Sequence, residues 1–145
     1  MRKAIQKDIN DKNVIKNEKD FKHLLEGRWN MCLNNLPIDY RFDYACVNKK
    51  GIVAWIELKN RNLHSYTFKD SMINLNKWLK AKELRDGTGI PTILAVRYYD
   101  KCLYIRLEDD TPHTIKWGAR TKKTRDDQDI GPAVHIPISA FKEIK

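Results

Sequence analysis

Apolar residues recur at helical spacing in the first third of the chain. From about Val14 to Leu36 they fall every three to four residues or at a multiple of that step, which is typical of one buried helix face. Pro37 lacks the amide hydrogen that would continue such a helix. The pattern therefore predicts a first helix over about 14–36, preceded by a loose, charged arm over residues 1–13.

The middle of the chain alternates strand-like and helical stretches. A second helix is expected over about Lys69–Arg85, and the turn-forming segment Asp86–Gly89 would end it. The stretches rich in β-branched, aromatic and other apolar residues predict strands at Arg41–Val47, Ile52–Asn60, Thr92–Tyr98 and Cys102–Leu107.

The last third is less regular. We expect an edge strand at His113–Trp117, a charged surface loop over 118–131, a short strand at Ala133–Ile136 and a final helical turn over Ser139–Ile144, capped by Ser139. The order α-β-β-α-β-β predicts an α/β fold with a mixed central sheet flanked by helices. We expect one domain over 14–145, with a core over 14–107 and a C-terminal extension over 108–145.

Charge narrows the choice of partners. The 145 residues include 28 basic and 19 acidic side chains, a net charge of +9. A basic domain favours polyanionic partners, nucleic acid first, although an inert basic surface is the alternative. The three cysteines lie far apart without zinc-ligand spacing, which indicates reduced thiols. With neither a signal peptide nor a membrane-spanning run, we expect a soluble, cytoplasmic protein.

Candidate chemistry lies in the second predicted strand. Glu57 and Lys59 are two residues apart, so they share one face of it. The apolar positions Ile52, Ala54, Ile56 and Leu58 take the other face and can pack on a core.

The preceding turn places Asp43. If the loop is the three residues Lys49-Lys50-Gly51, Gly51 takes the position that requires a positive φ, and Asp43 lies opposite Glu57 with Cβ atoms about 5 Å apart. A two-residue loop, Lys49-Lys50, would instead set Asp43 opposite Ile56, on the wrong face.

Two facing carboxylates repel each other unless a cation lies between them. Mg²⁺ suits such a pair, because it is typically held by one or two carboxylates together with phosphate and water. It can lower the pKa of a bound water and screen a phosphodiester, while Lys59 adds positive charge. A plain cross-strand salt-bridge cluster is the alternative, because the D…E-x-K pattern is short.

Other candidates come from outside the hairpin. Glu18 falls in the apolar sector of the first predicted helix, so it either points at a site or forms a partly exposed salt bridge. The aromatic residues Tyr40, Tyr44, Trp55 and Tyr66 are expected in the core or on strand faces, with base stacking as the alternative.

These residues resemble the PD-(D/E)XK nuclease superfamily, in particular small phage-type or Holliday-junction-resolvase-like members. The family's Asp and its (Asp/Glu)-x-Lys match Asp43 and Glu57-Leu58-Lys59, and Ile56–Arg61 resembles the family's "vEiKxR" strand. Three later parts of the chain also resemble family segments. Ile73–Trp78 resembles the family's second helix, and Pro91–Arg97 resembles the core strand that follows it. Gly118–Arg120 and Val134–Pro137 resemble the ending of phage-type members.

The resemblance implies a restriction-endonuclease-like αβββα core and a metal-dependent endodeoxyribonuclease that uses Mg²⁺, with Mn²⁺ as a substitute. Metal ligands would be Asp43, Glu57 and the backbone carbonyl of Leu58, with Glu18 assisting. Lys59 would stabilise charge, and Lys77 would contact the reacting phosphate. The residues expected to hold the DNA backbone are Lys49, Lys50, Arg61, Arg120, Lys122, Lys123 and Arg125.

Two departures from the family pattern concern the Asp. Phe42 replaces the Pro that often precedes it, whereas a Pro does occur in Pro37-Ile38-Asp39. Asp39 is the weaker candidate, because it would lie opposite Arg61, about 13 Å from Asp43 along the strand.

The small size favours structure-selective cleavage of branched or junction DNA, which suits a homodimer, and a phage source follows from the resemblance. The alternative function is a non-catalytic nucleic-acid-binding module on the same fold, whose binding would persist without magnesium. A third alternative is an interaction domain with an incidental salt-bridge cluster.

Overall fold

The computed structural model describes residues 17–118 and 131–145. The predicted N-terminal arm and most of the predicted loop over 118–131 lie outside the described residues. The same holds for four of the expected DNA contacts, Arg120, Lys122, Lys123 and Arg125.

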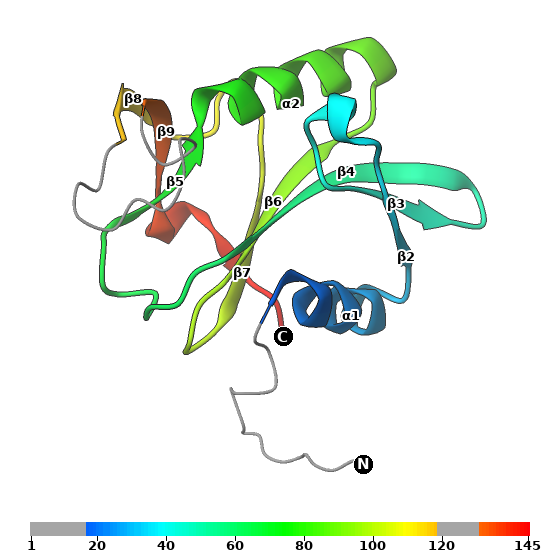
Figure 1. The fold of residues 1–145 in the computed structure, drawn as a ribbon, viewed down its shortest axis with the longest axis horizontal. Helices are drawn as coiled ribbons and strands as arrows, with labels where there is room; N and C mark the ends of the chain where they lie inside the picture. Colours follow the sequence, from blue (N-terminus) through cyan, green and yellow to red (C-terminus); the bar gives the residue numbers. More distant parts are fainter. Residues whose placement is uncertain (1–16, 119–130) are drawn as a thin grey trace.

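A six-stranded mixed sheet forms the centre of the fold, with the order β10-β7-β6-β4-β3-β2 (Figure 1). Only β4 and β6 are parallel within it, and the chain joins them through β5 and α2. The strands are β2 (Cys32–Asn35), β3 (Tyr44–Asn48), β4 (Gly51–Asn60), β6 (Thr92–Arg97), β7 (Cys102–Arg106) and β10 (Lys142–Glu143). The expected α/β fold with a mixed central sheet is confirmed.

Two helices cover opposite faces of this sheet, α1 (Glu18–Trp29) on one side and α2 (Leu75–Thr88) on the other (Figure 1). A second, three-stranded sheet lies at the N-terminal end of α2, with the order β5-β9-β8 (Figure 1). Its strands are β5 (Asp70–Asn74), β9 (Pro132–Pro137) and β8 (Thr114–Trp117).

Strand alternation in β4 divides the core in two. Ala54, Ile56 and Leu58 pack with Phe21 and Leu25 of α1, as predicted for that face. Ile52, at the tip of the hairpin, is 42% exposed instead. Trp55 packs on the other side, in the cluster that includes Trp78 and Ala81 of α2. Glu57 and Lys59 therefore project toward the α2 layer.

The first helix is shorter than predicted. It ends where Asn30 adopts a left-handed conformation (φ 54°) and donates its N–H to the carbonyl of Glu26. Cys32–Asn35 then forms the edge strand β2 against β3, with Leu33 as its one buried residue. The helical prediction for this segment was wrong because so short an apolar pattern fits either a helix or a strand.

The second helix begins later than predicted. Residues 70–74 form β5, which pairs with β9. The side chain of Asn74 caps the helix by accepting the N–H of Lys77, and Gly89 ends it with φ 73°. The expected start at Lys69 was wrong because it overlooked Asn74 as a capping residue and because β5 depends on a distant partner strand.

The C-terminal segment also differs from the prediction. A short 3-10 helix, η5 (Ile138–Ala140), contains Ser139 and lacks a side-chain cap, and Lys142–Glu143 form β10 against β7. The expected helical turn is wrong because β7 offers a free edge to this segment. The expected edge strand is confirmed as β8, whereas β9 is the central strand of the second sheet.

The β3–β4 hairpin reaches the expected register by a different route. Its turn has two residues, Lys49-Lys50, because Asn48 pairs with Gly51. Val53 is then an extra residue on β4, since Val47 pairs with Ile52 but Cys46 pairs with Ala54. This bulge shifts the register back, so Tyr44 pairs with Ile56 and the next position along would set Asp43 opposite Glu57.

All three cysteines are free. Within residues 17–118 and 131–145, no helix is both long enough and apolar enough to span a bilayer.

Candidate active site

Glu57 is a buried acid on the α2 face of β4, with 2% of its surface exposed. Lys59 reaches it from the same strand, with Nζ 3.7 Å from Oε2. Lys77 reaches it from the first turn of α2, with Nζ 3.3 Å from Oε1. The cap at Asn74 fixes the start of α2 and hence the position of Lys77. One carboxylate is thus held between two ammonium groups from different elements.

Burial dominates the charge state of Glu57. Loss of solvent and, to a lesser extent, the nearby Asp43 carboxylate raise its pKa to about 7, against the opposing effect of Lys77 and Lys59. Although Oε1 faces the ammonium of Lys77, it accepts no hydrogen bond of good geometry from the described part of the chain. The site therefore contains a buried acceptor oxygen that a cation could satisfy.

Asp43 lies just before β3, where strand pairing stops. Leu58 pairs with Ala95 of β6 on one side but has no β3 residue opposite it on the other, and its N–H donates there to Oδ2 of Asp43 at 2.9 Å. The pKa of Asp43 is raised by burial, although this hydrogen bond lowers it. Since the N–H and C=O of one strand residue point to the same edge, the Leu58 carbonyl faces Asp43 as well.

Glu18 reaches the site from α1, on the opposite side of the sheet from α2. It is the first residue of α1 and is exposed, because tight packing on the sheet begins at Phe21, but it lies on the helix face that contacts the sheet, as predicted. Its Oε2 accepts the hydroxyl of Tyr44 at 2.6 Å. Glu18 also raises the pKa of Asp43, and both line a pocket of about 270 Å³ together with Lys77.

Tyr44 was predicted as a core or strand-face aromatic, but its hydrogen bond to the candidate site residue Glu18 was not predicted from the sequence. Burial raises its pKa, and the hydrogen bond to Glu18 adds to the effect. The signal was its position next to Asp43, because neighbours on a strand point to opposite faces and Tyr44 must face α1.

The oxygen donors match one kind of metal. No group of three or more His, Cys, Asp and Glu side chains that could hold a metal occurs in the parts of the chain that the structure describes. Two carboxylates and a backbone carbonyl are available at Asp43, Glu57 and Leu58. This set fits Mg²⁺, which keeps several waters and needs few protein ligands.

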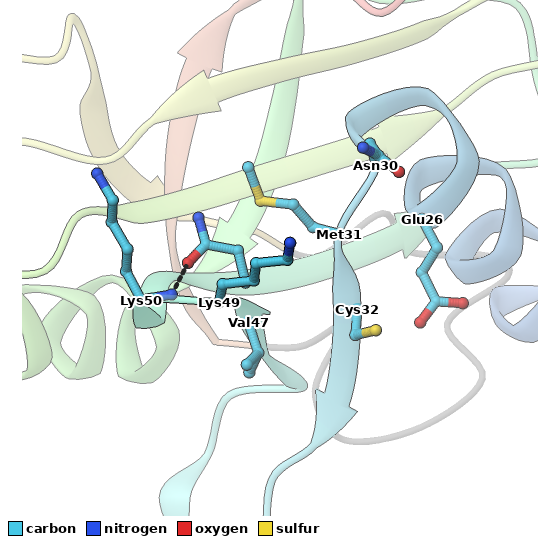
Figure 2. A pocket seen from close by; sticks show the side chains of 8 residues that line it. Glu26, Asn30, Met31, Cys32, Val47, Lys49 and Lys50 are labelled. Atoms are coloured by element: carbon cyan, nitrogen blue, oxygen red, sulfur yellow. Dashed lines mark hydrogen bonds between the residues drawn. The ribbon is translucent and has the colours of Figure 1, made fainter.

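Lys49 and Lys50 lie apart from this site, at the tip of the hairpin, about 20 Å from Asp43 along the strand direction. Both line a separate pocket of about 750 Å³ together with Glu26 and Cys32. Figure 2 shows the side chains of the two lysines on one side and those of Glu26 and Cys32 on the other. The side chain of Asn48 accepts the N–H of Lys50 and so helps to hold the turn. The structure thus does not bring these two lysines together with the acidic residues.

The remaining predicted residues differ in how far they are buried. Arg61 is half-buried, and its Nη2 donates to the carbonyl of Met72 at 2.8 Å. Asp39 lies exposed in the 3-10 helix η2 (Ile38–Tyr40), so the expected strand pairing with Arg61 is wrong. Of the four aromatic residues, Tyr44 and Trp55 are buried as expected, whereas Tyr40 (43%) and Tyr66 (76%) are exposed.

Comparison with known proteins agrees with the fold and the motif. Among curated proteins, none matches the sequence. A solved structure with a similar fold is Hjc, a Holliday junction resolvase from the archaeal hyperthermophile Archaeoglobus fulgidus. Its TM-score is 0.54 at 15% identity, and the similarity covers 86% of this chain and 88% of Hjc. The sequence matches the family described as "Phage putative PDDEXK endonuclease" over residues 8–144, and the chain therefore belongs to this family of PD-(D/E)XK nucleases.

Proposed function

We propose that this protein is a magnesium-dependent endonuclease that hydrolyses phosphodiester bonds in DNA at the site around Asp43 and Glu57. One observation carries the proposal. Glu57 is buried beside a second carboxylate, and one of its oxygens accepts no hydrogen bond of good geometry from the described residues. Lys59 and Lys77 offset part of the free-energy cost of burying Glu57 beside Asp43, and a metal cation between the two carboxylates would offset more of it.

Asp43, Glu57 and the carbonyl of Leu58 would hold the metal, in line with the general use of divalent metals by PD-(D/E)XK nucleases. Bound magnesium would lower the pKa of a water molecule and screen the negative charge of the phosphodiester. Mn²⁺ has similar ligand preferences and is expected to substitute.

Two lysine side chains would contact the phosphate of the substrate. Lys59 and Lys77 are 24% and 17% exposed, so each ammonium can reach a phosphate oxygen while it remains near Glu57. Their positive charge would stabilise the additional negative charge that develops on the phosphate in the transition state. Glu18, at the other side of the pocket, is placed to orient a water molecule through its free acceptor capacity.

Branched or junction DNA is the substrate class that we favour. The net charge of +9 suits a polyanion, and the similar fold of Hjc belongs to a Holliday junction resolvase. A homodimer would place two such sites on the two strands of a junction.

The decisive experiment incubates the wild type and Glu57→Ala with linear duplex, single-stranded, flapped and four-way-junction DNA, with and without Mg²⁺ or Mn²⁺. We expect cleavage by the wild type alone, and only with metal. Lys80→Ala is a matched control, because Lys80 lies on α2 and pairs with Glu83. Metal-independent binding by all three proteins with no cleavage of any substrate would instead indicate a non-catalytic DNA-binding module.

A further inference from the structure

The loop between β2 and β3 carries the most exposed large apolar side chain in the described residues, Ile38, which is 95% exposed. Single exposed apolar residues are common and need no explanation by themselves. Ile38 differs because it lines the same pocket as Asp43 and Lys77.

Both ends of this loop are fixed. Phe42 is buried at 3% in the core, and Leu36 packs against the same core. The N–H of Leu36 also donates to the carbonyl of Asp43 at 2.9 Å, which closes the loop across its base. The loop is therefore anchored to the strand that carries the site.

Internal bonds hold the tip of the loop in one shape. Tyr40 donates its N–H to the carbonyl of Pro37 at 3.0 Å, and Arg41 donates to that of Ile38 at 3.1 Å. Pro37 fixes its own φ, and Arg41 takes a left-handed φ of 59°, which is unusual for a residue other than glycine. Ile38 is thus presented on a short 3-10 helix, visible as the cyan coil on the α2 side of the sheet (Figure 1).

The side chains around Ile38 suit contact with DNA whose bases are partly unstacked. Apolar side chains, including Ile, are inserted between base steps by proteins that kink DNA. Arg41 is exposed, lines the same pocket and can contact a backbone phosphate, while Tyr40 offers a partly exposed ring for stacking. An isoleucine beside the reacting phosphate would therefore meet the bases that flank it.

We propose that Ile38 is a wedge that enters a base step next to the scissile phosphate, so that the site acts on DNA whose bases are already unstacked at a branch point. This inference rests on the proposed nuclease function and adds a determinant of substrate choice. Insertion into continuous duplex must first separate stacked bases, whereas a branch point offers an open step.

The test compares Ile38→Ser with Ile52→Ser, a control at the hairpin tip where an isoleucine is also exposed. We expect Ile38→Ser to lower cleavage of four-way-junction and flapped DNA by about tenfold, with Ile38→Leu restoring most of it and Ile52→Ser remaining like the wild type. Equal cleavage by Ile38→Ser and the wild type would overturn the wedge.

A second measurement is independent of catalysis. In a Glu57→Ala background, DNA with 2-aminopurine at the branch should brighten on binding, and Ile38→Ser should remove this signal while Ile52→Ser keeps it. If this pattern occurs but the wild type cleaves no DNA, the nuclease function fails and the wedge stands. Loss of a dimer on Ile38→Ser in sedimentation velocity, without a change in fluorescence, would assign Ile38 to a protein interface and overturn the wedge.

Discussion

Lys77 and Glu57 form an ion pair between α2 and β4, with Nζ 3.3 Å from Oε1. The helix thus supplies a counter-charge to an acid that the strand buries. Because Asp43 lies on the same side and raises the pKa of Glu57, the charge state of the pair depends on β4, on α2 and on the residue that precedes β3.

Replacing Lys77 should change the pH dependence of cleavage. Lys77→Met removes a cation that lowers the pKa of Glu57, so that pKa should rise. We expect cleavage at pH 7 to fall roughly 10- to 100-fold, with the midpoint of the pH–rate profile shifted upward. Lys80→Met should leave the midpoint unchanged, and an unshifted midpoint in Lys77→Met would refute the coupling.

Glu57→Gln should separate stability from activity. The amide keeps the shape of the side chain but carries no charge that must be buried, so we expect a higher free energy of unfolding than the wild type above pH 7 in EDTA. Cleavage should fall at least about 100-fold, because the amide is a poor metal ligand. Urea unfolding and a cleavage assay on the same preparations would check both outcomes.

The raised pKa of Glu57 also predicts how stability varies with pH. In the folded protein the pKa is about 7, above the ordinary value of 4.5. The folded state therefore binds the proton more tightly, and its stabilising contribution is fully present below pH 4.5 and is lost as the pH rises to 7. The loss is about 3 kcal/mol at most. Urea unfolding at pH 5 and pH 8 without metal should show this decline in the wild type relative to Glu57→Gln.

Metal binding should follow the same titration. Because Glu57 must lose its proton to bind a cation, magnesium affinity should increase as the pH rises through about 7. Isothermal titration with Mg²⁺ at pH 6 and pH 8 measures this difference. Equal affinities at the two pH values would remove Glu57 from the ligand set.

Gly51 should matter through its backbone conformation. Its φ is +115°, and an added Cβ would meet no atom within 4 Å, so Gly51→Ala should cost about 1–3 kcal/mol through strain alone. Gly87→Ala is the control, since Gly87 lies in α2 with equal space and without a positive φ. That change should stabilise by about 0.5–1 kcal/mol. Thermal unfolding of both variants would distinguish the two effects.

Substitution of the exposed lysines at the hairpin tip should show whether the DNA-contacting surface extends that far from the active site. Each of Lys49→Ala and Lys50→Ala should weaken binding to DNA of any sequence and reduce the slope of log K against log salt by about 1. Salt titrations by fluorescence anisotropy measure this slope. No change in either variant would limit the DNA surface to regions nearer Asp43.

Local rules allowed much of the site to be predicted. The shared face of Glu57 and Lys59 follows from the two-residue period of a strand and requires no tertiary information. The position of Asp43 opposite Glu57 was also predicted, but for a partly wrong reason. The actual turn has two residues, and the bulge at Val53 corrects the register. A bulge changes side-chain orientation without a distinct apolar pattern, so the sequence alone did not reveal it.

The sequence by itself determined the class of fold, the face that carries Glu57 and Lys59, and the family motif, because these depend on local alternation and on residue identity. Only the tertiary structure decided that Cys32–Asn35 and Asp70–Asn74 are strands, since a short segment adopts the conformation for which a partner strand is available. It also decided that Lys77 reaches Glu57 while Glu18 bonds Tyr44 on the opposite face. Contacts between elements depend on how whole layers pack, and that packing is fixed by the sum of many side chains rather than by the spacing of a few.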